Sequence, residues 1–378
     1  MTDSTDKTIQ SRHVPIIIGN CAPFRLVTRK SEKWEPTLEQ INDRTYDYVK
    51  LCRLSMFIDV GIKPYSIAIS FDGSLILPGI EKFRNRDVAL NKFNETLGIL
   101  LLGGIYSEAI QPVDISFGTM FLDGYVKQHG GGSGAISNFH NSIRTKTVGI
   151  GDAIRLLEPK TLLNTDIQSA YKKGQEYFQI IPTLSPSLLL NGISNYVKHQ
   201  WIEALIFLWT SIEQLINIIW KKEVMLSGKT NNEEVIEGRS KFLEDFRTWT
   251  TSTKIEVLYQ KGIINPNLYR QLNTARKSRN DFVHSSKELN EDKVRTALES
   301  LFTILSLIVS DYKDTDRLSD TLEMVLKNQR GDLFPKKTVF EKGEISHWME
   351  LPPLPGDPSW SGDYEIIKEF VLKPLEKP

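Results

Sequence analysis

The stretch from Leu268 to Ser285, LYRQLNTARKSRNDFVHS, has the apolar spacing of an amphipathic helix. At about 100° per residue, its apolar side chains fall on one stripe, which consists of Leu268, Leu272, Ala275, Phe282 and Val283. Arg279 falls in the middle of that stripe, within about 60° of each member. A guanidinium on a core-facing stripe is unfavourable unless it has a fixed anionic partner or lines a cleft. The stretch therefore predicts a helix with an ion-paired or functional arginine.

Three polar residues of the same helix lie beside that arginine. Arg276, Asn280 and His284 follow one another at intervals of four residues and form a polar flank of the stripe. We therefore expect Arg279, Asn280 and His284 to converge on one sector of the helix, which makes them the candidate catalytic residues.

Charge is distributed unevenly along the chain. The 378 residues contain 47 Lys+Arg and 47 Asp+Glu, so the formal net charge is zero. Zero net charge argues against a protein that coats nucleic acid or anionic lipid through bulk electrostatics. Residues 257–280, however, contain no acid and five bases, namely Lys261, Arg270, Arg276, Lys277 and Arg279. Such a run is usually a solvated face, but its position makes Arg270, Arg276 and Lys277 candidate phosphate-binding residues.

A second charged residue lies on an apolar stripe upstream. The segment Gln200–Val224 is apolar nearly all round and predicts a helix in the centre of a bundle. On it, Glu213 falls among Ile202, Ile206, Trp209, Ile216 and Trp220. We expect Glu213 to be buried and to pair with Arg279 or His284, either as a supporting site residue or as an ion pair that only fixes the helix register.

The whole chain predicts an α+β protein. Hydrophobic residues make up 40% and charged residues 25%, as in ordinary globular proteins, and the length suits two or three domains. Residues 1–160 are expected to form a mixed α/β domain, with a helix at Asp87–Leu102, a loop at His129–Gly134 and strands at Val14–Ile18, Phe24–Thr28, Tyr65–Phe71, Leu75–Leu77 and Val113–Leu122.

Helical patterns dominate in residues 161–320. Besides Gln200–Val224, helices are expected from Ser185 to Tyr196, and at Val235–Thr248, Ser252–Lys261, Asn265–Ser285 and Glu291–Tyr312, with a polar loop at Ser227–Glu234. Residues 321–378 are expected to form a proline-rich extension, because seven of the 17 prolines follow residue 330 and Leu351–Gly356 cannot be helical.

Several classes of site and location are excluded by residue type. Cys21 and Cys52 are too few for a disulfide framework or a cysteine-rich zinc site, and the six histidines lack metal-ligand spacing, so no metal and no cofactor are expected. Gly228-Lys229-Thr230 lacks the first glycine of a P-loop, and the glycines after His129 have no matching nucleophile elbow. The polar start of the chain and the absence of an apolar run of about 18 residues predict a cytoplasmic protein without a membrane segment.

The motif Arg279-Asn280-x-x-x-His284 resembles the R-N-x-x-x-H motif of HEPN domains, which are compact all-helical domains of prokaryotic toxin and antiphage systems. The resemblance covers about Leu162–Asp316. It rests on the motif, its place in the penultimate long helix, the long helix that follows, and the upstream helix around Leu208–Leu215.

This resemblance implies a metal-independent endoribonuclease whose partners are RNA and a second copy of the chain, bound through the helical domain. His284 would act as general acid and base, Arg279 would bind the scissile phosphate, and Asn280 would orient His284 or hold a phosphate oxygen. Glu213 would position Arg279 or tune His284. The 2′-hydroxyl of the RNA would be the nucleophile and would leave a 2′,3′-cyclic phosphate.

The same resemblance implies an effector of antiphage, abortive-infection defence, with the N-terminal domain sensing a phage or regulatory trigger. The main alternative is a non-catalytic HEPN scaffold that binds nucleotide, RNA or a protein partner. An unrelated helical domain with a structural buried ion pair is a third interpretation.

Overall fold

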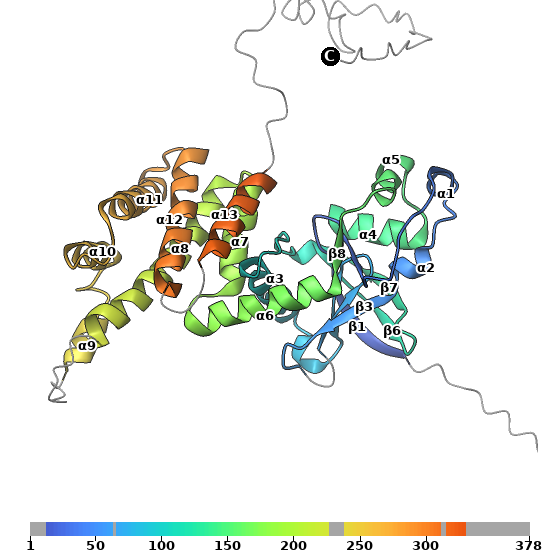
Figure 1. Cartoon of the computed structure of the whole chain (residues 1–378), viewed down its shortest axis with the longest axis horizontal. Coiled ribbons are helices and arrows are strands. Elements are labelled where there is room, and N and C mark those ends of the chain that lie inside the picture. The colour runs from blue at the N-terminus through green and yellow to red at the C-terminus, as the bar shows by residue number, and fades with distance from the viewer. Residues whose placement is uncertain (1–12, 63–65, 227–237, 311–314, 330–378) are drawn as a thin grey trace, which may run out of the picture. The chain divides into compact units, whose positions relative to one another are not determined.

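The computed structural model describes residues 13–62, 66–226, 238–310 and 315–329. Strands and helices are mixed up to about residue 163, and helices alone follow, so the α+β prediction is confirmed (Figure 1). The loop predicted at Ser227–Glu234 and the proline-rich extension after residue 329 lie outside the described residues.

Six antiparallel strands form the main sheet, in the order β3-β4-β5-β1-β6-β7. Their bounds are β1 His13–Gly19, β3 Leu54–Ile58, β4 Ile67–Ser70, β5 Leu75–Pro78, β6 Ile115–Phe121 and β7 Val126–Gly131. A parallel pair, β2 Leu26–Thr28 and β8 Thr161–Leu163, forms a second small sheet. Every strand predicted from the sequence is present, but β3, β7 and β8 were not predicted.

The predicted loop at His129–Gly134 is partly wrong, because His129–Gly131 belongs to β7. In the sheet, a Cβ on Gly130 would lie 3.1 Å from the Phe117 ring of the neighbouring strand β6. Glycine therefore serves here to let an aromatic side chain lie against the strand, a reason that the sequence pattern alone does not reveal.

The main sheet curls until its two outer strands meet at one end. Arg53 and Tyr125 form an antiparallel bridge, and the amide of Leu54 donates to the carbonyl oxygen of Gly124 at 2.9 Å. A separate apolar cluster packs on one face of the curled sheet, made of Ile16, Ile18, Ala68, Ile76 and Val126. The opposite face packs against helix α3, Arg86–Leu102, through residues such as Leu75 and Phe93.

Short helices cover the remaining surface of the sheet part. They are α1 Leu38–Asn42, α2 Tyr48–Leu51, α4 Ala135–Thr145 and α5 Ile150–Ala153, with 3₁₀ turns at Glu81–Phe83, Pro112–Asp114 and Ile154–Leu156. Of these, α4 matters most for the site described below, because its buried face carries polar side chains.

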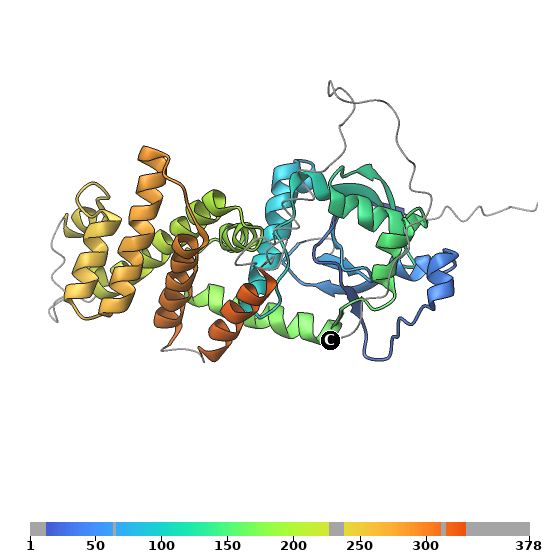
Figure 2. The same ribbon diagram turned by 90° about the horizontal axis from the view of Figure 1, so that it is seen from above.

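Helix α3 joins the sheet part to the helical part. It packs against α6, Asn164–Ile180, and α7, Pro186–Val197, and the two views place α3 and α6 between the sheet and the remaining helices (Figures 1 and 2). At the closest approach a Cβ on Gly103 would lie 1.9 Å from the carbonyl oxygen of Ala170, and a Cβ on Gly174 would lie 1.9 Å from that of Ile99. One continuous apolar core therefore runs from the sheet through α3 into the helices.

The other helices are α8 Trp201–Trp220, α9 Arg239–Glu244, α10 Thr251–Gln260, α11 Pro266–Ser285, α12 Glu291–Val309 and α13 Asp316–Asn328, with a π-helical turn at Lys221–Leu226 after α8. Ser185 caps α7 by accepting a hydrogen bond from the amide of Leu188, as its place before Pro186 predicts. Helix α13 was not predicted; it packs against α12 and α7 and continues the helical structure past residue 320.

Helix α8 is the central helix of this part and packs against α7, α10, α11 and α12. Ile202 and Ile206, expected to lie in the core with Glu213, are each 41% exposed, because the first turns of α8 are covered on one side only. The segment Trp201–Leu226 is long and apolar enough to cross a membrane, but half of it is buried within the protein, as is typical of the core helix of a soluble protein.

Candidate functional site

The motif lies on α11, whose start is fixed locally. Asn265 caps the helix by accepting a hydrogen bond from the amide of Leu268 at 2.8 Å, and Pro266 occupies the first turn. Leu268, Leu272 and Ala275 are buried, as their spacing predicts. The stripe does not stay buried to the end of the helix, because Phe282 is half-buried and Val283 is 48% exposed.

Arg279 is half-buried on the last turns of α11 and has no acidic partner among the described residues. Its Nη1 donates to the side-chain oxygen of the adjacent Asn280 at 3.1 Å. The remaining donors of the guanidinium fork are unused by the described part of the chain. The structure thus joins Arg279 to Asn280 by a hydrogen bond, and the described part of the chain offers no carboxylate to its positive charge.

His284 is exposed in the last turn of α11, and its ring has no hydrogen-bond partner in the described chain. Five residues along a helix correspond to a rotation of roughly 140° and a rise of roughly 7.5 Å. Arg279 and His284 therefore leave α11 in different directions, so the expectation that Arg279, Asn280 and His284 converge on one sector is wrong for His284. A single copy of the helix presents an arginine–asparagine pair and a separate free imidazole.

Glu213 was expected to pair with Arg279 or His284, and this expectation is wrong. Glu213 is half-buried and accepts a hydrogen bond from the hydroxyl of Thr251 at 3.1 Å. The reason is that α10 runs parallel to α8 along this side: Lys254 donates to the side chain of Asn217 at 2.7 Å one turn further on. Helix α10 thus supplies the polar partner that the sequence pattern assigned to α11.

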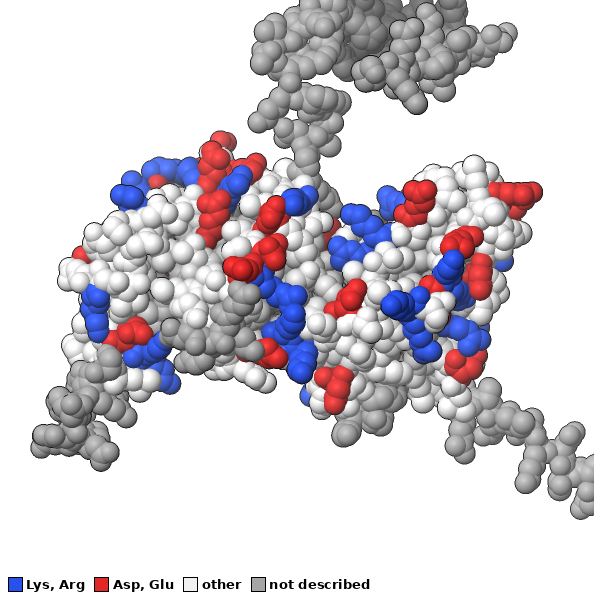
Figure 3. All heavy atoms as spheres, viewed as in Figure 1, with Lys and Arg blue, Asp and Glu red and all other residues white. Residues whose placement is uncertain are grey.

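The basic residues of α11 do not share one face. Arg276 is half-buried about 60° from Arg279, and its Nε donates to the side chain of Asn273 at 3.4 Å. Arg270 and Lys277 are exposed and leave the helix roughly 160–180° from Arg279. Figure 3 shows Lys and Arg side chains beside Asp and Glu side chains in the region where Figure 1 places α11 and α12. Of the three predicted phosphate-binding residues, only Arg276 lies on the side of Arg279.

A polar cluster that sequence reasoning missed is buried between the sheet and α4. It consists of Asp72 in the β4–β5 turn and His140 and Arg144 on α4, whose exposed fractions are 0%, 1% and 4%. One oxygen of Asp72 lies 2.9 Å from Nδ1 of His140 and 2.7 Å from Nη2 of Arg144. The spacing of His140 and Arg144, one helical turn apart, is the signal in the sequence that places both on one face.

Hydrogen bonds hold the members of this cluster in place. Nε2 of His140 lies 3.0 Å from the carbonyl oxygen of Cys21, which can only accept. Nδ1 lies 2.9 Å from the carboxylate of Asp72 and 3.2 Å from the hydroxyl of Ser74. Burial alone would raise the pKa of Asp72, but Arg144 and His140 hold it well below its usual range.

Neutral side chains complete the network at this end of the sheet. Asn20 donates to the carbonyl oxygen of Asp114 and to the hydroxyls of Ser116 and Ser137, each at 3.1 Å. Since the charged members are at most 4% exposed, they are closed to substrate, and the cluster serves to hold α4 on the sheet.

Comparison with known proteins gives no relative for this arrangement: no family model, no curated protein and no solved structure matches the chain.

Proposed function

We propose that this chain is a metal-independent endoribonuclease, a cytoplasmic effector of antiphage, abortive-infection defence, whose site is Arg279, Asn280 and His284. The proposal rests on the resemblance of the motif to that of HEPN domains. The single structural observation that supports it is the half-buried guanidinium of Arg279, which has a hydrogen bond to Asn280 and no carboxylate partner among the described residues. The donors of such a fork match the geometry of phosphodiester oxygens.

In this proposal the RNA supplies its own nucleophile. The 2′-hydroxyl gives its proton to an imidazole acting as general base and attacks the adjacent phosphorus. The bond from phosphorus to the 5′-oxygen breaks, and that oxygen takes a proton from a second, protonated imidazole. Arg279 stabilises the negative charge that grows on the phosphoryl oxygens. The products are a 2′,3′-cyclic phosphate and a 5′-hydroxyl.

A homodimer through the helical part would supply the second imidazole. One copy carries one free His284, turned roughly 140° away from Arg279, so a composite site would combine Arg279 and His284 with the partner's His284. The helical part also exposes apolar side chains on two helices that pack against each other: Ile202 and Ile206 on α8, and Val283 on α11. In this proposal a second copy covers these exposed apolar side chains.

A non-catalytic HEPN scaffold that binds nucleotide, RNA or a protein is the alternative, and one observation favours it. A general base is normally oriented by a hydrogen bond to its second ring nitrogen, and His284 has no such bond in the described chain. The two proposals differ in one measurable respect: the scaffold binds RNA or its partner without cleaving it.

Cleavage of mixed RNA in the presence of EDTA tests the enzyme. We expect 2′,3′-cyclic phosphate ends from the wild type, and a rate lower by about 10²–10⁴-fold for His284→Ala and by about 10²–10³-fold for Arg279→Ala. Matched controls are His129→Ala, an exposed histidine of β7, and Arg295→Ala, an arginine of α12 that pairs with Glu299 at 3.0 Å. Undiminished cleavage by His284→Ala, or cleavage only without EDTA, would contradict the proposal.

The dimer has its own test. Light scattering of the purified chain should give the mass of two copies, and Ile206→Glu should give the mass of one. Leu122→Glu, in an 83% exposed position of the sheet part, is the matched control and should leave the mass unchanged. A wild-type monomer that still cleaves RNA would refute the composite site.

A further inference from the structure

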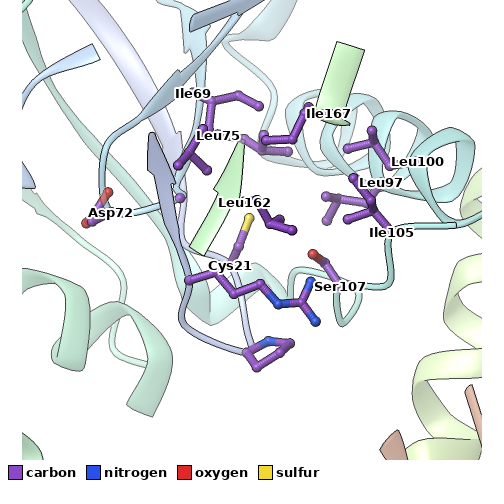
Figure 4. Close-up of a pocket in the computed structure, with 14 residues that line it drawn as sticks. Cys21, Ile69, Asp72, Leu75, Leu97, Leu100, Ile105, Ser107, Leu162 and Ile167 are labelled. Atoms are coloured by element: carbon purple, nitrogen blue, oxygen red, sulfur yellow. The ribbon is translucent and has the colours of Figure 1, made fainter. Parts of the chain in front are cut away.

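A cavity lies where the sheet, α3 and α6 meet, away from the motif helix (Figure 4). Its walls are mostly apolar and include Ile69, Leu75, Leu97, Leu100, Leu162 and Ile167. These residues belong to β4, β5, α3, β8 and α6, so both parts of the chain contribute. The volume of the cavity is about 40 Å³, and it rises to about 440 Å³ when the empty space that opens to solvent at its mouth is included.

One cation lines this apolar cavity. Arg25 is half-buried, and its Nη1 donates to the backbone carbonyl oxygen of Tyr106 at 2.6 Å. No acidic side chain forms an ion pair with Arg25 in the described part of the chain. Burial lowers its pKa below the ordinary value, since no carboxylate offsets the loss of solvation. A guanidinium in this setting gains most from an anion that enters the cavity.

The other polar groups of the lining permit such an anion. The Asp72 carboxylate points away from the centre of the cavity in Figure 4 and is held by Arg144 at 2.7 Å. Burial raises the pKa of the Cys21 thiol to about 12, so this group is neutral and does not repel a negative charge. Ser107 lies in the loop after α3 and also lines the cavity (Figure 4). Its hydroxyl has no partner among the described residues.

We propose that this cavity binds a short-chain monocarboxylate, whose carboxylate is held by Arg25 and Ser107 and whose alkyl group packs against Leu97, Leu100 and Leu162. The single positive charge matches one carboxylate, and the apolar walls favour the burial of a hydrocarbon group. A volume of about 40 Å³ accommodates roughly three or four water-sized groups, which limits the alkyl group of the ligand to roughly two to four carbons. Phosphate would leave the apolar walls unfilled and present more charge than Arg25 neutralises.

Binding would couple the two parts of the chain, because the ligand would contact walls from the sheet, α3 and α6 at once. A ligand that binds only the folded protein raises its melting temperature in a saturable way. This effect is independent of RNA cleavage, so the proposal stands or falls separately from the nuclease.

The test uses the full-length chain, with thermal unfolding and isothermal titration against propionate, isobutyrate and isovalerate at constant ionic strength. Isobutyramide and inorganic phosphate are the ligand controls. We expect saturable binding of at least one carboxylate at millimolar concentration, and at least tenfold weaker binding of the amide and of phosphate. No saturable binding of any of the three carboxylates, or equal binding of phosphate, would overturn the proposal.

Two variants assign the site. Arg25→Met should weaken carboxylate binding at least tenfold, whereas Arg29→Met, an exposed arginine four residues further on, should bind like the wild type. Leu162→Phe fills the cavity without removing a charge and should abolish binding while the chain stays folded. If Arg25→Met does not fold, carboxylate binding by Leu162→Phe alone tests the assignment of the site. Unchanged binding by Arg25→Met or by Leu162→Phe would refute the assignment.

Discussion

Replacing Asp72 with asparagine tests the buried cluster between the sheet and α4. The change keeps the shape of the side chain and removes its charge. It leaves the guanidinium of Arg144 and the ring of His140, which lie 2.7 Å and 2.9 Å from the Asp72 carboxylate, buried without the carboxylate that both contact. Asp72→Asn should therefore destabilise the fold far more than the loss of an exposed ion pair would.

The expected magnitude follows from the burial of all three groups. Removing one partner of a buried ion pair lowers the free energy of unfolding by about 3–5 kcal/mol. An unfolding entropy of about 2.1 cal/mol/K per residue, over roughly 320 residues, gives about 0.7 kcal/mol per degree. The melting temperature of Asp72→Asn should then fall by about 4–8 °C at pH 7.

Melting temperatures measured at several pH values also test the direction in which the stabilisation changes with pH. Arg144 and His140 hold the folded-state pKa of Asp72 below its ordinary value, against the effect of burial. The stabilisation by this carboxylate is therefore complete above about pH 4, the pKa of an unfolded aspartate, and is lost as the pH falls further. Melting temperatures of the wild type and Asp72→Asn, taken by circular dichroism from pH 7 to pH 3, should converge at the acid end.

Asp123→Asn is the matched control. Asp123 pairs with Arg53 at 3.3 Å, and its side chain is 56% exposed, so its loss should lower the free energy of unfolding by less than about 1 kcal/mol. The reasoning fails if Asp72→Asn behaves like Asp123→Asn, or if the difference from the wild type stays constant down to pH 3.

Three further predictions concern buried groups elsewhere. Burial raises the pKa of Cys21 to about 12 and that of Cys52 to about 11. Neither thiol of the native protein should therefore react with Ellman's reagent at pH 8, whereas both should react in denaturant. Rapid reaction of the native protein would show that the thiols are open to solvent. The same shifts predict that the free energy of unfolding falls as the pH rises above about 9, the pKa of the thiols in the unfolded chain. Gly103→Ala should lower the free energy of unfolding, measured in urea, by at least about 2 kcal/mol, because its Cβ would meet the carbonyl oxygen of Ala170 at 1.9 Å. Gly151→Ala, which has open space around it, is the control and should change this free energy by less than about 1 kcal/mol. Equal effects of the two substitutions would contradict the close helix contact.

Local signals in the sequence predicted those elements whose ends and faces depend on nearby residues. Ser185-Pro186 and Asn265-Pro266 mark the starts of α7 and α11, and Gly103 follows the end of α3, because caps act within one turn. Helix α4 was missed for the opposite reason. His140 and Arg144 lie on its buried face. Apolar periodicity does not predict a helix whose buried face carries polar and charged side chains.

The candidate site was predictable in part for the same reason. The spacing on α11 placed Arg279 in the middle of the core-facing stripe, which depends on helix geometry alone, whereas the structure leaves it half-buried. The partner of Glu213 depends on the direction in which α10 packs along α8, and Thr251 lies 38 residues further along the chain. Packing between helices decides such a pair, and no local pattern in the sequence reports it.

The reciprocal contact of Gly103 with α6 and of Gly174 with α3 has a consequence for how a signal crosses the molecule. Two helix backbones this close, inside one continuous core, leave no linker about which the sheet and the motif helix could swing apart. If the sheet receives the trigger of the proposed function, its effect on α11 would pass through the helices packed between them. Cutting the chain near residue 160 would expose apolar surface of this shared core on both fragments.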